Sequence, residues 1–192
     1  MPSFVRAACL LLVACISDAS LATPPGLQSD AVVAELLALQ ARLDDDTAEV
    51  STTALTSEAC AVRLLSGALL YRRDPNRYRN ALFAELVVDD YAERSAGKYN
   101  EIGTDEAVSV MDAASVAPEG ITDQRIQMVI GFCALKDKNL WMKARDGSRI
   151  SLARFFRGAA LASLLKGTDE DAAAITSAID AHTARRHPSP AP

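Results

Sequence analysis

The chain has little of what catalytic and metal sites usually require. Only two histidines occur among its 192 residues, His182 and His187, and both lie near the C-terminus. No CxxC or HxxxH spacing is present, so the common zinc motifs are missing. The sequence also has no G-x-S-x-G elbow and no Gly-rich phosphate loop, and neither histidine is well placed to activate a nucleophile. These absences predict a protein without enzymatic activity, cofactor or metal.

Carboxylates leave one catalytic alternative open. A glycosidase needs only two of them, and the sequence offers Glu85, Asp89, Glu101, Asp105 and Glu119. However, charged residues make up 23% of the chain, and an ordinary soluble protein has about a quarter. Such residues are expected by default, and a small carboxylate-dependent hydrolase remains the second alternative.

Long hydrophobic runs are also missing. The apolar run at residues 7–16 is about half as long as the roughly twenty residues that a helix needs to span a bilayer. It follows a short, positively charged segment, residues 1–6, and this order is typical of an export signal. We therefore expect the folded domain outside the cytoplasm, in the periplasm.

Two processing sites compete within this signal. Ser20-Leu21-Ala22 has small residues at the two positions that signal peptidase recognises, which predicts an export signal of residues 1–22. Leu12-Val13-Ala14-Cys15 instead resembles the lipobox of bacterial lipoproteins, which implies a signal of residues 1–14 and a lipid on Cys15. Residues 23–28 suit an unstructured tether. Contact with the membrane is expected only through such an N-terminal lipid anchor.

The four cysteines reduce to one pair. Cys9 leaves with the signal and Cys15 is either removed or lipidated, so Cys60 and Cys133 remain. In an oxidising compartment we expect these two to form a disulfide, with two unpaired buried thiols as the alternative. A bridge across so long a stretch of chain stabilises a domain by roughly 4 kcal/mol in the chain-entropy model.

The formal net charge of −5 bears on the partner. Mild acidity argues against nucleic acid or anionic lipid as the main partner. It is compatible with a protein partner that presents a basic surface.

Apolar residues recur at helical spacing along most of the chain, which predicts a mainly α fold. We expect a compact bundle of about six to seven helices in a single domain, residues 29–186, followed by a disordered tail, residues 187–192. The expected helices cover residues 29–43, 58–73, 77–94, 104–117, 122–136, 152–166 and 169–185. Residues 139–151 alternate instead and contain the turn signal Asp146-Gly147, which predicts a short β-hairpin near residues 140–150.

Two of these helices have clear apolar faces. In the helix at residues 122–136, Thr122 is the expected N-cap, and one stripe is formed by Ile126, Val129, Ile130 and Cys133. This stripe points Cys133 inward, towards the element that carries Cys60. In the helix at residues 152–166, Ser151 is the expected N-cap, and the buried side is expected to contain Leu152, Phe155, Phe156 and Ala159.

Five residues are candidates for binding a protein partner: Asp89, Asp90, Tyr91, Tyr99 and Trp141. The first three form an acidic patch with an aromatic residue that can anchor a partner. Trp141 is the only tryptophan and is expected on the strand face opposite its neighbours. There it either covers the edge of the core or meets a partner.

Two charged clusters have alternative interpretations. Arginines at positions 72, 73, 77 and 79 surround the turn at Asp74-Pro75, with Tyr71 and Tyr78 among them. Basic residues with aromatics can bind nucleic acid or an anionic ligand, but a solvated turn is favoured because acidic residues lie nearby. The acidic triplet at residues 44–46 is also interpreted as a solvated turn, because the D-x-D-x-D-G spacing of a calcium loop is missing.

The run Ala117-Pro118-Glu119-Gly120-Ile121-Thr122, the apolar helix after it and the later helix at residues 151–165 resemble the second half of a known family. These are small periplasmic immunity proteins that protect bacteria from type VI secreted amidases, in which a Pro-x-Gly-[Val/Ile]-Thr turn also starts a helix. A cysteine usually precedes that proline, whereas this chain has Val116-Ala117. The resemblance implies an inhibitor that neutralises a secreted toxin by occluding its active site. An envelope assembly or structural lipoprotein is the first alternative.

Overall fold

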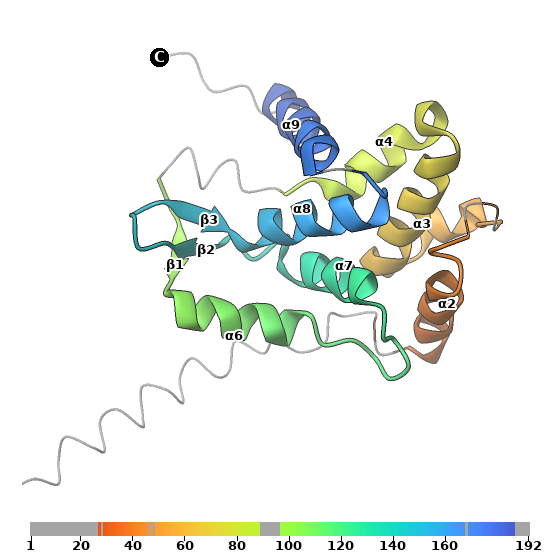
Figure 1. Ribbon diagram of the computed structural model, residues 1–192, viewed down its shortest axis with the longest axis horizontal. Helices are drawn as coiled ribbons and strands as arrows, with labels where there is room; N and C mark the ends of the chain where they lie inside the picture. The colour runs from red at the N-terminus through yellow and green to blue at the C-terminus, as the bar shows by residue number, and fades with distance from the viewer. Residues whose placement is uncertain are drawn as a thin grey trace, which may run out of the picture.

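The computed structural model describes residues 27, 29–45, 47, 49–88, 97–167 and 169–186. These residues form seven α-helices, one 3-10 helix and a three-stranded sheet, so the expected mainly α fold is confirmed (Figure 1). Within this part of the chain, no helix has the length and apolar character needed to cross a membrane. The export signal, Cys15 and the C-terminal tail lie outside the described residues.

Helix α3, Cys60–Arg73, lies at the centre of the core. It contacts helices α2, α4, α7 and α8 and the 3-10 helix η1, Thr52–Thr56. Its buried residues surround the helix axis and are Ala61, Val62, Leu64, Leu65, Ser66, Gly67, Ala68, Leu69 and Leu70. The helix begins at Cys60, two residues later than expected, because η1 and its C-cap Ser57 directly precede this part of the chain.

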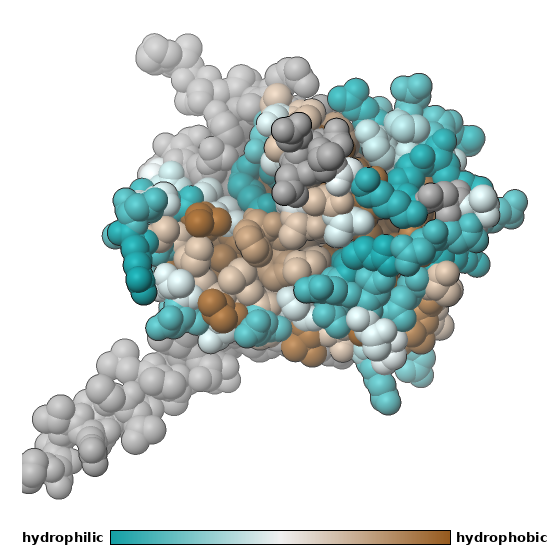
Figure 2. All heavy atoms as spheres, in the orientation of Figure 1, coloured by the Kyte–Doolittle hydropathy of each residue, from teal (hydrophilic) through white to brown (hydrophobic). Residues whose placement is uncertain are grey.

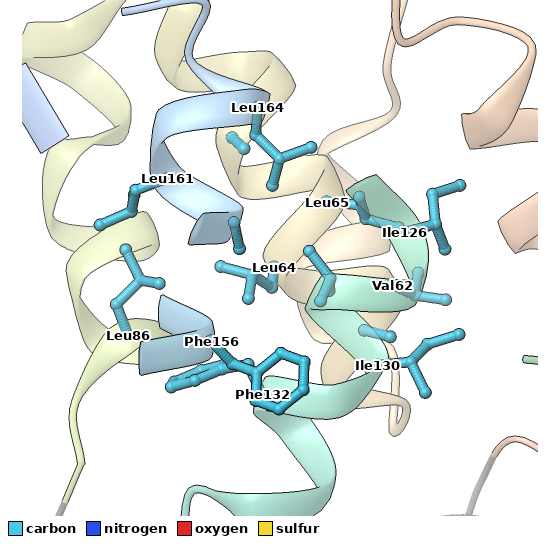
Figure 3. Packing of buried hydrophobic residues seen from close by; sticks show 14 of the residues in the cluster. Val62, Leu64, Leu65, Leu86, Ile126, Ile130, Phe132, Phe156, Leu161 and Leu164 are labelled. Carbon is cyan, nitrogen blue, oxygen red and sulfur yellow. The ribbon is translucent and has the colours of Figure 1, made fainter. Parts of the chain in front are cut away.

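Helix α7, Gln124–Leu135, has the predicted apolar face. Ile126, Val129 and Ile130 are fully buried, and Figure 3 shows Ile126 and Ile130 in one cluster with side chains of α3. Cys133 is half-buried and forms the expected disulfide with Cys60, with 5.9 Å between the two Cα atoms. The N-cap is Asp123, one residue after the expected Thr122, because the Asp123 side chain accepts a hydrogen bond from the Arg125 N–H.

Helix α8, Leu152–Leu164, packs closely along α7, and Ser151 caps it as expected. A glycine makes this approach possible, since a Cβ atom at Gly131 would lie 2.6 Å from Cε1 of Phe156. The predicted buried face is wrong in part. Phe156 is buried, but Phe155 is 52% exposed and Ala159 is only half-buried.

The difference arises because an arginine belongs to the inner face of α8. Arg157 is 1% exposed. Its guanidinium donates to Asp180 of helix α9, Asp169–Arg186, at 3.0 Å and to the carbonyl oxygen of Leu86 at 3.3 Å. Because these partners satisfy the buried charge, the helix turns Arg157 inward, and Phe155 then faces outward.

Helix α4, Pro75–Leu86, forms a helical hairpin with α3. The Asp74 side chain caps it by accepting from the Arg77 N–H at 3.1 Å. Gly67 of α3 allows a close crossing, since a Cβ atom there would lie 3.6 Å from the Leu82 Cα. The helix ends at Leu86, short of the expected residue 94, and the next residue is extended.

The sheet contains one strand that the sequence did not indicate. Strands β2, Leu140–Lys143, and β3, Arg149–Ser151, form the predicted antiparallel hairpin. The additional strand β1, Asn100–Ile102, pairs in parallel with β2, so the order is β1-β2-β3. The sequence could not indicate this strand, because three residues that pair across about forty positions of chain leave no local pattern.

Helix α2, Asp30–Gln40, is attached to the start of α7 by polar contacts. The Gln40 side-chain oxygen accepts from the N–H groups of Thr122 and Asp123 at 3.0 Å each. Arg125 binds both Asp123, at 2.6 Å, and Asp44, at 2.7 Å. These hydrogen bonds hold the pKa values of both carboxyls below their usual range. The start of the acidic triplet therefore joins α2 to α7.

Two further helices lie at the periphery of the fold. Helix α6, Thr104–Ala114, contacts α7 and β2 and starts after Gly103. Helix α9 lies beside α8, and Ala172 and Ile179 are its buried apolar residues among the described side chains. Figure 1 shows it at the same end of the molecule as α4.

Candidate partner-binding surface

Two of the five predicted partner residues lie together at the sheet. Tyr99 directly precedes β1 and Trp141 lies on β2, and their rings meet edge to face with 5.0 Å between centroids. Asp89, Asp90 and Tyr91 lie outside the described residues.

Trp141 is held inside the protein and is not presented at the surface. Its side chain is 7% exposed, and its ring N–H donates to the side-chain oxygen of Asn139 at 2.7 Å. The register pairs Trp141 with Glu101 and Ser151, so it lies on the sheet face opposite Leu140 and Met142, as predicted. A partner would therefore reach the half-buried Tyr99 before Trp141.

Arg149 of β3 completes this cluster. Its guanidinium lies 4.7 Å from the centroid of the Tyr99 ring and forms an ion pair with Glu101 of β1. The hydrogen bond to Glu101 raises the pKa of Arg149, so the side chain keeps its charge at any physiological pH. The cluster ties the two outer strands of the sheet together and offers a cationic group beside an aromatic ring.

The exposed apolar side chains lie elsewhere. Figure 2 shows apolar atoms gathered over α8, the β2–β3 hairpin and α6. The large exposed apolar residues of these elements are Phe155, Ile150 and Val108, and we call them the Phe155 surface. Ile150 pairs with Met142 and so lies on the sheet face opposite Trp141. Within the sheet, the Phe155 surface and the Trp141 cluster therefore use opposite faces, through Ile150 and Trp141.

The Phe155 side chain is exposed to solvent but is held in position by a neighbouring ring. Its ring packs edge to face against Phe156, with 6.0 Å between centroids, and Phe156 is locked against Gly131. A rigid, exposed aromatic ring loses little conformational entropy on binding, and such rings dominate the energetics of protein interfaces. The hairpin beside it is charged, with Lys143, Arg145 and Asp146 exposed. An apolar centre with a charged margin is the usual composition of a protein interface.

Of the carboxylates considered for catalysis, Asp89 lies outside the described residues, and Glu85 and Glu101 are bound to cations. Glu85 of α4 pairs with Arg63 at 2.8 Å and with Lys136 at 3.9 Å, whereas Glu101 pairs with Arg149. Asp105 is exposed in the first turn of α6, and Glu119 is exposed in the turn before α7. Among the described residues, no group of three or more His, Cys, Asp and Glu side chains is placed to hold a metal ion.

Sequence reasoning missed the most exposed aromatic residue of this surface. Helical spacing from Leu152 fits Phe155 and Phe156 equally well, because they are three and four positions further along. The discriminating signal is the burial of Arg157, and this depends on Asp180, which lies on another helix.

The turn carrying the family resemblance has a clear local geometry. Gly120 adopts a positive φ of 86°, the Ile121 N–H donates to the Pro118 carbonyl oxygen at 3.1 Å, and Ile121 is buried. A side chain at Gly120 would be strained in this conformation. Comparison of the chain with models of protein families, with curated proteins and with solved structures finds no match.

Proposed function

We propose that this chain is an exported binding protein that neutralises a secreted protein toxin by covering the toxin's active site. The observation that supports it most is the Phe155 surface, where a rigid aromatic ring stands 52% exposed on a well-packed scaffold. Soluble monomers seldom expose large contiguous apolar patches unless these serve an interaction.

Two further features support an extracytoplasmic inhibitor. The leader at residues 1–22 has the order of an export signal, and the Cys60–Cys133 disulfide suits an oxidising compartment. The bridge joins α3 to α7, the helix on which α8 and Phe155 rest. A protein that inhibits by covering an active site benefits from such a fixed surface. A surface that is already ordered loses little conformational entropy when the partner binds.

The test is complex formation with secreted toxins encoded beside the gene for this chain. The protein purified from the periplasm should form a stoichiometric complex with one of them and abolish its enzymatic activity. Phe155→Ser should weaken this complex by about thirtyfold or more, since an interface hot spot contributes about 2 kcal/mol or more.

The matched control is Leu37→Ser on α2. Leu37 is exposed but belongs to a different element from those of the Phe155 surface, so its replacement should leave the affinity unchanged. Equal binding by the wild-type protein and Phe155→Ser would contradict this assignment of the surface. A stoichiometric complex with an envelope component, and none with a toxin, would favour the assembly function instead.

A further inference from the structure

A second surface feature lies away from the Phe155 surface, where the end of α3 and the start of α4 face α9. These elements line an open cleft of about 260 Å³. Its apolar lining comes from Tyr71, Phe83, Ile175 and Ala178, and its polar lining from Asn76 and Arg79. Figure 1 shows α4 and α9 together at the top of the view.

One of the arginines predicted around the α3–α4 turn, Arg79, lies at this cleft. The Arg79 guanidinium lies 5.1 Å from the centroid of the Phe83 ring, at the cleft itself. Arg77 lies over the Tyr78 ring at 5.2 Å, and Arg73 donates to the Thr47 carbonyl oxygen. Within the described part of the chain, none of these three guanidinium groups forms an ion pair with a carboxylate.

The acid of this turn, Asp74, forms no ion pair with a described side chain. Asp74 accepts the N–H of Arg77 as the cap of α4, so its carboxylate is directed to the helix end. Arg79 is thus the only charged side chain among the described residues that line the cleft, and it stands beside an apolar floor. The complementary ligand carries a carboxylate next to an apolar group.

We propose that this cleft binds an acidic peptide segment of a partner protein, with an apolar side chain on the floor and the neighbouring carboxylate on Arg79. Arginine suits this task because its planar guanidinium can bind a carboxylate through two hydrogen bonds. The volume favours a peptide, since about 260 Å³ is less than the ~300–1,000 Å³ of pockets that enclose whole small molecules. It is sufficient for one or two side chains. The site goes beyond the proposed inhibitor function and does not depend on it.

The probe is a capped tripeptide, leucine-aspartate-leucine, acetylated and amidated at its ends. It is titrated into the intact protein while backbone amide signals are followed by NMR. The expected result is saturable shifts confined to α4, the end of α3 and the middle of α9. The matched peptide with asparagine in place of aspartate should bind about fivefold more weakly, which is the upper range for an exposed ion pair.

Two pairs of variants localise the binding. Arg79→Gln should weaken the aspartate peptide about fivefold and leave the asparagine peptide unchanged, whereas Arg77→Gln, outside the cleft, should change neither. Ala174→Trp should abolish binding of both peptides by filling the cleft, and Ala173→Trp should not. Ala173 and Ala174 are both exposed on α9, and only Ala174 lines the cleft, so the fold tolerates both changes.

Several outcomes overturn the proposal. Equal affinity for the two peptides would show that the carboxylate plays no part in binding. Equal weakening by Arg79→Gln and Arg77→Gln would show that the peptide is held by general electrostatic attraction and not at a defined site. If the peptide causes no saturable shifts, it is not the ligand. The same holds if decanoate, a fatty-acid anion with a carboxylate and an apolar chain, binds and the peptide does not. Phe155→Ser should leave peptide binding unchanged, so failure here is distinct from failure of the inhibitor function.

Discussion

The two faces of α8 use the same residue type in opposite ways. Phe156 is 2% exposed and fills the space that Gly131 leaves open on α7. Phe155, its neighbour in the chain, is 52% exposed and rests on the edge of that buried ring. The inner ring therefore contributes to folding, whereas the outer ring remains available to a partner. Under the proposed function, adjacent positions of one helix therefore serve stability and binding.

The largest expected effect separates these two rings. Phe156→Ala should lower the free energy of unfolding by about 3–5 kcal/mol, because it leaves a cavity in the core. Phe155→Ala should lower it by about 1 kcal/mol or less, since only an edge contact is lost. Urea unfolding monitored by the fluorescence of Trp141, the only tryptophan and a buried one, measures both. Similar losses of unfolding free energy in the two variants would contradict the different roles of the two rings.

A smaller effect with opposite signs should come from two glycines. Gly131→Ala should destabilise the protein by about 1–2 kcal/mol, because the new methyl group forces the Phe156 ring to move and this outweighs the gain in helix propensity. Gly158→Ala on α8 should stabilise it by up to about 1 kcal/mol, since no atom lies within 4 Å of the added Cβ. Thermal unfolding of both variants is the measurement. A stable Gly131→Ala protein would show that the α7–α8 contact is looser than the structure indicates.

The same comparison explains how much of the molecule the sequence could predict. The core face of α7 followed from local spacing of apolar residues, and the disulfide followed from eliminating Cys9 and Cys15. Both inferences use information that is present within a short stretch or a simple count. They concern the inner side of the fold, where apolar burial determines the outcome.

The outer surface depended on contacts between distant residues. The orientation of Phe155 is set by the Arg157–Asp180 ion pair between α8 and α9, and β1 exists through its pairing with β2. The cleft beside Arg79 requires α9 to lie against the α3–α4 hairpin. None of these pairings leaves a periodic signal in the sequence. The arginine cluster itself could be predicted, but the apolar floor next to it could not.

The smallest expected effect is that of acidic pH on the free energy of unfolding. Arg125 holds the pKa values of Asp123 and Asp44 below their usual value of 3.8 through hydrogen bonds. The folded pKa is therefore lower than the unfolded one, so this clamp contributes stability above about pH 4, and the contribution is lost as the pH falls through the folded values.

The free energy of unfolding should thus decline as the pH falls below about 4, and in Arg125→Met this decline should be shallower. Urea unfolding of both proteins across this range measures the difference. Parallel curves would show that the clamp joining α2 to α7 contributes nothing to the acid sensitivity of the fold. In that case other carboxylates would be responsible. The aromatic ring of Phe155 does not titrate, so acid should weaken the scaffold without changing the chemistry of the surface that it supports.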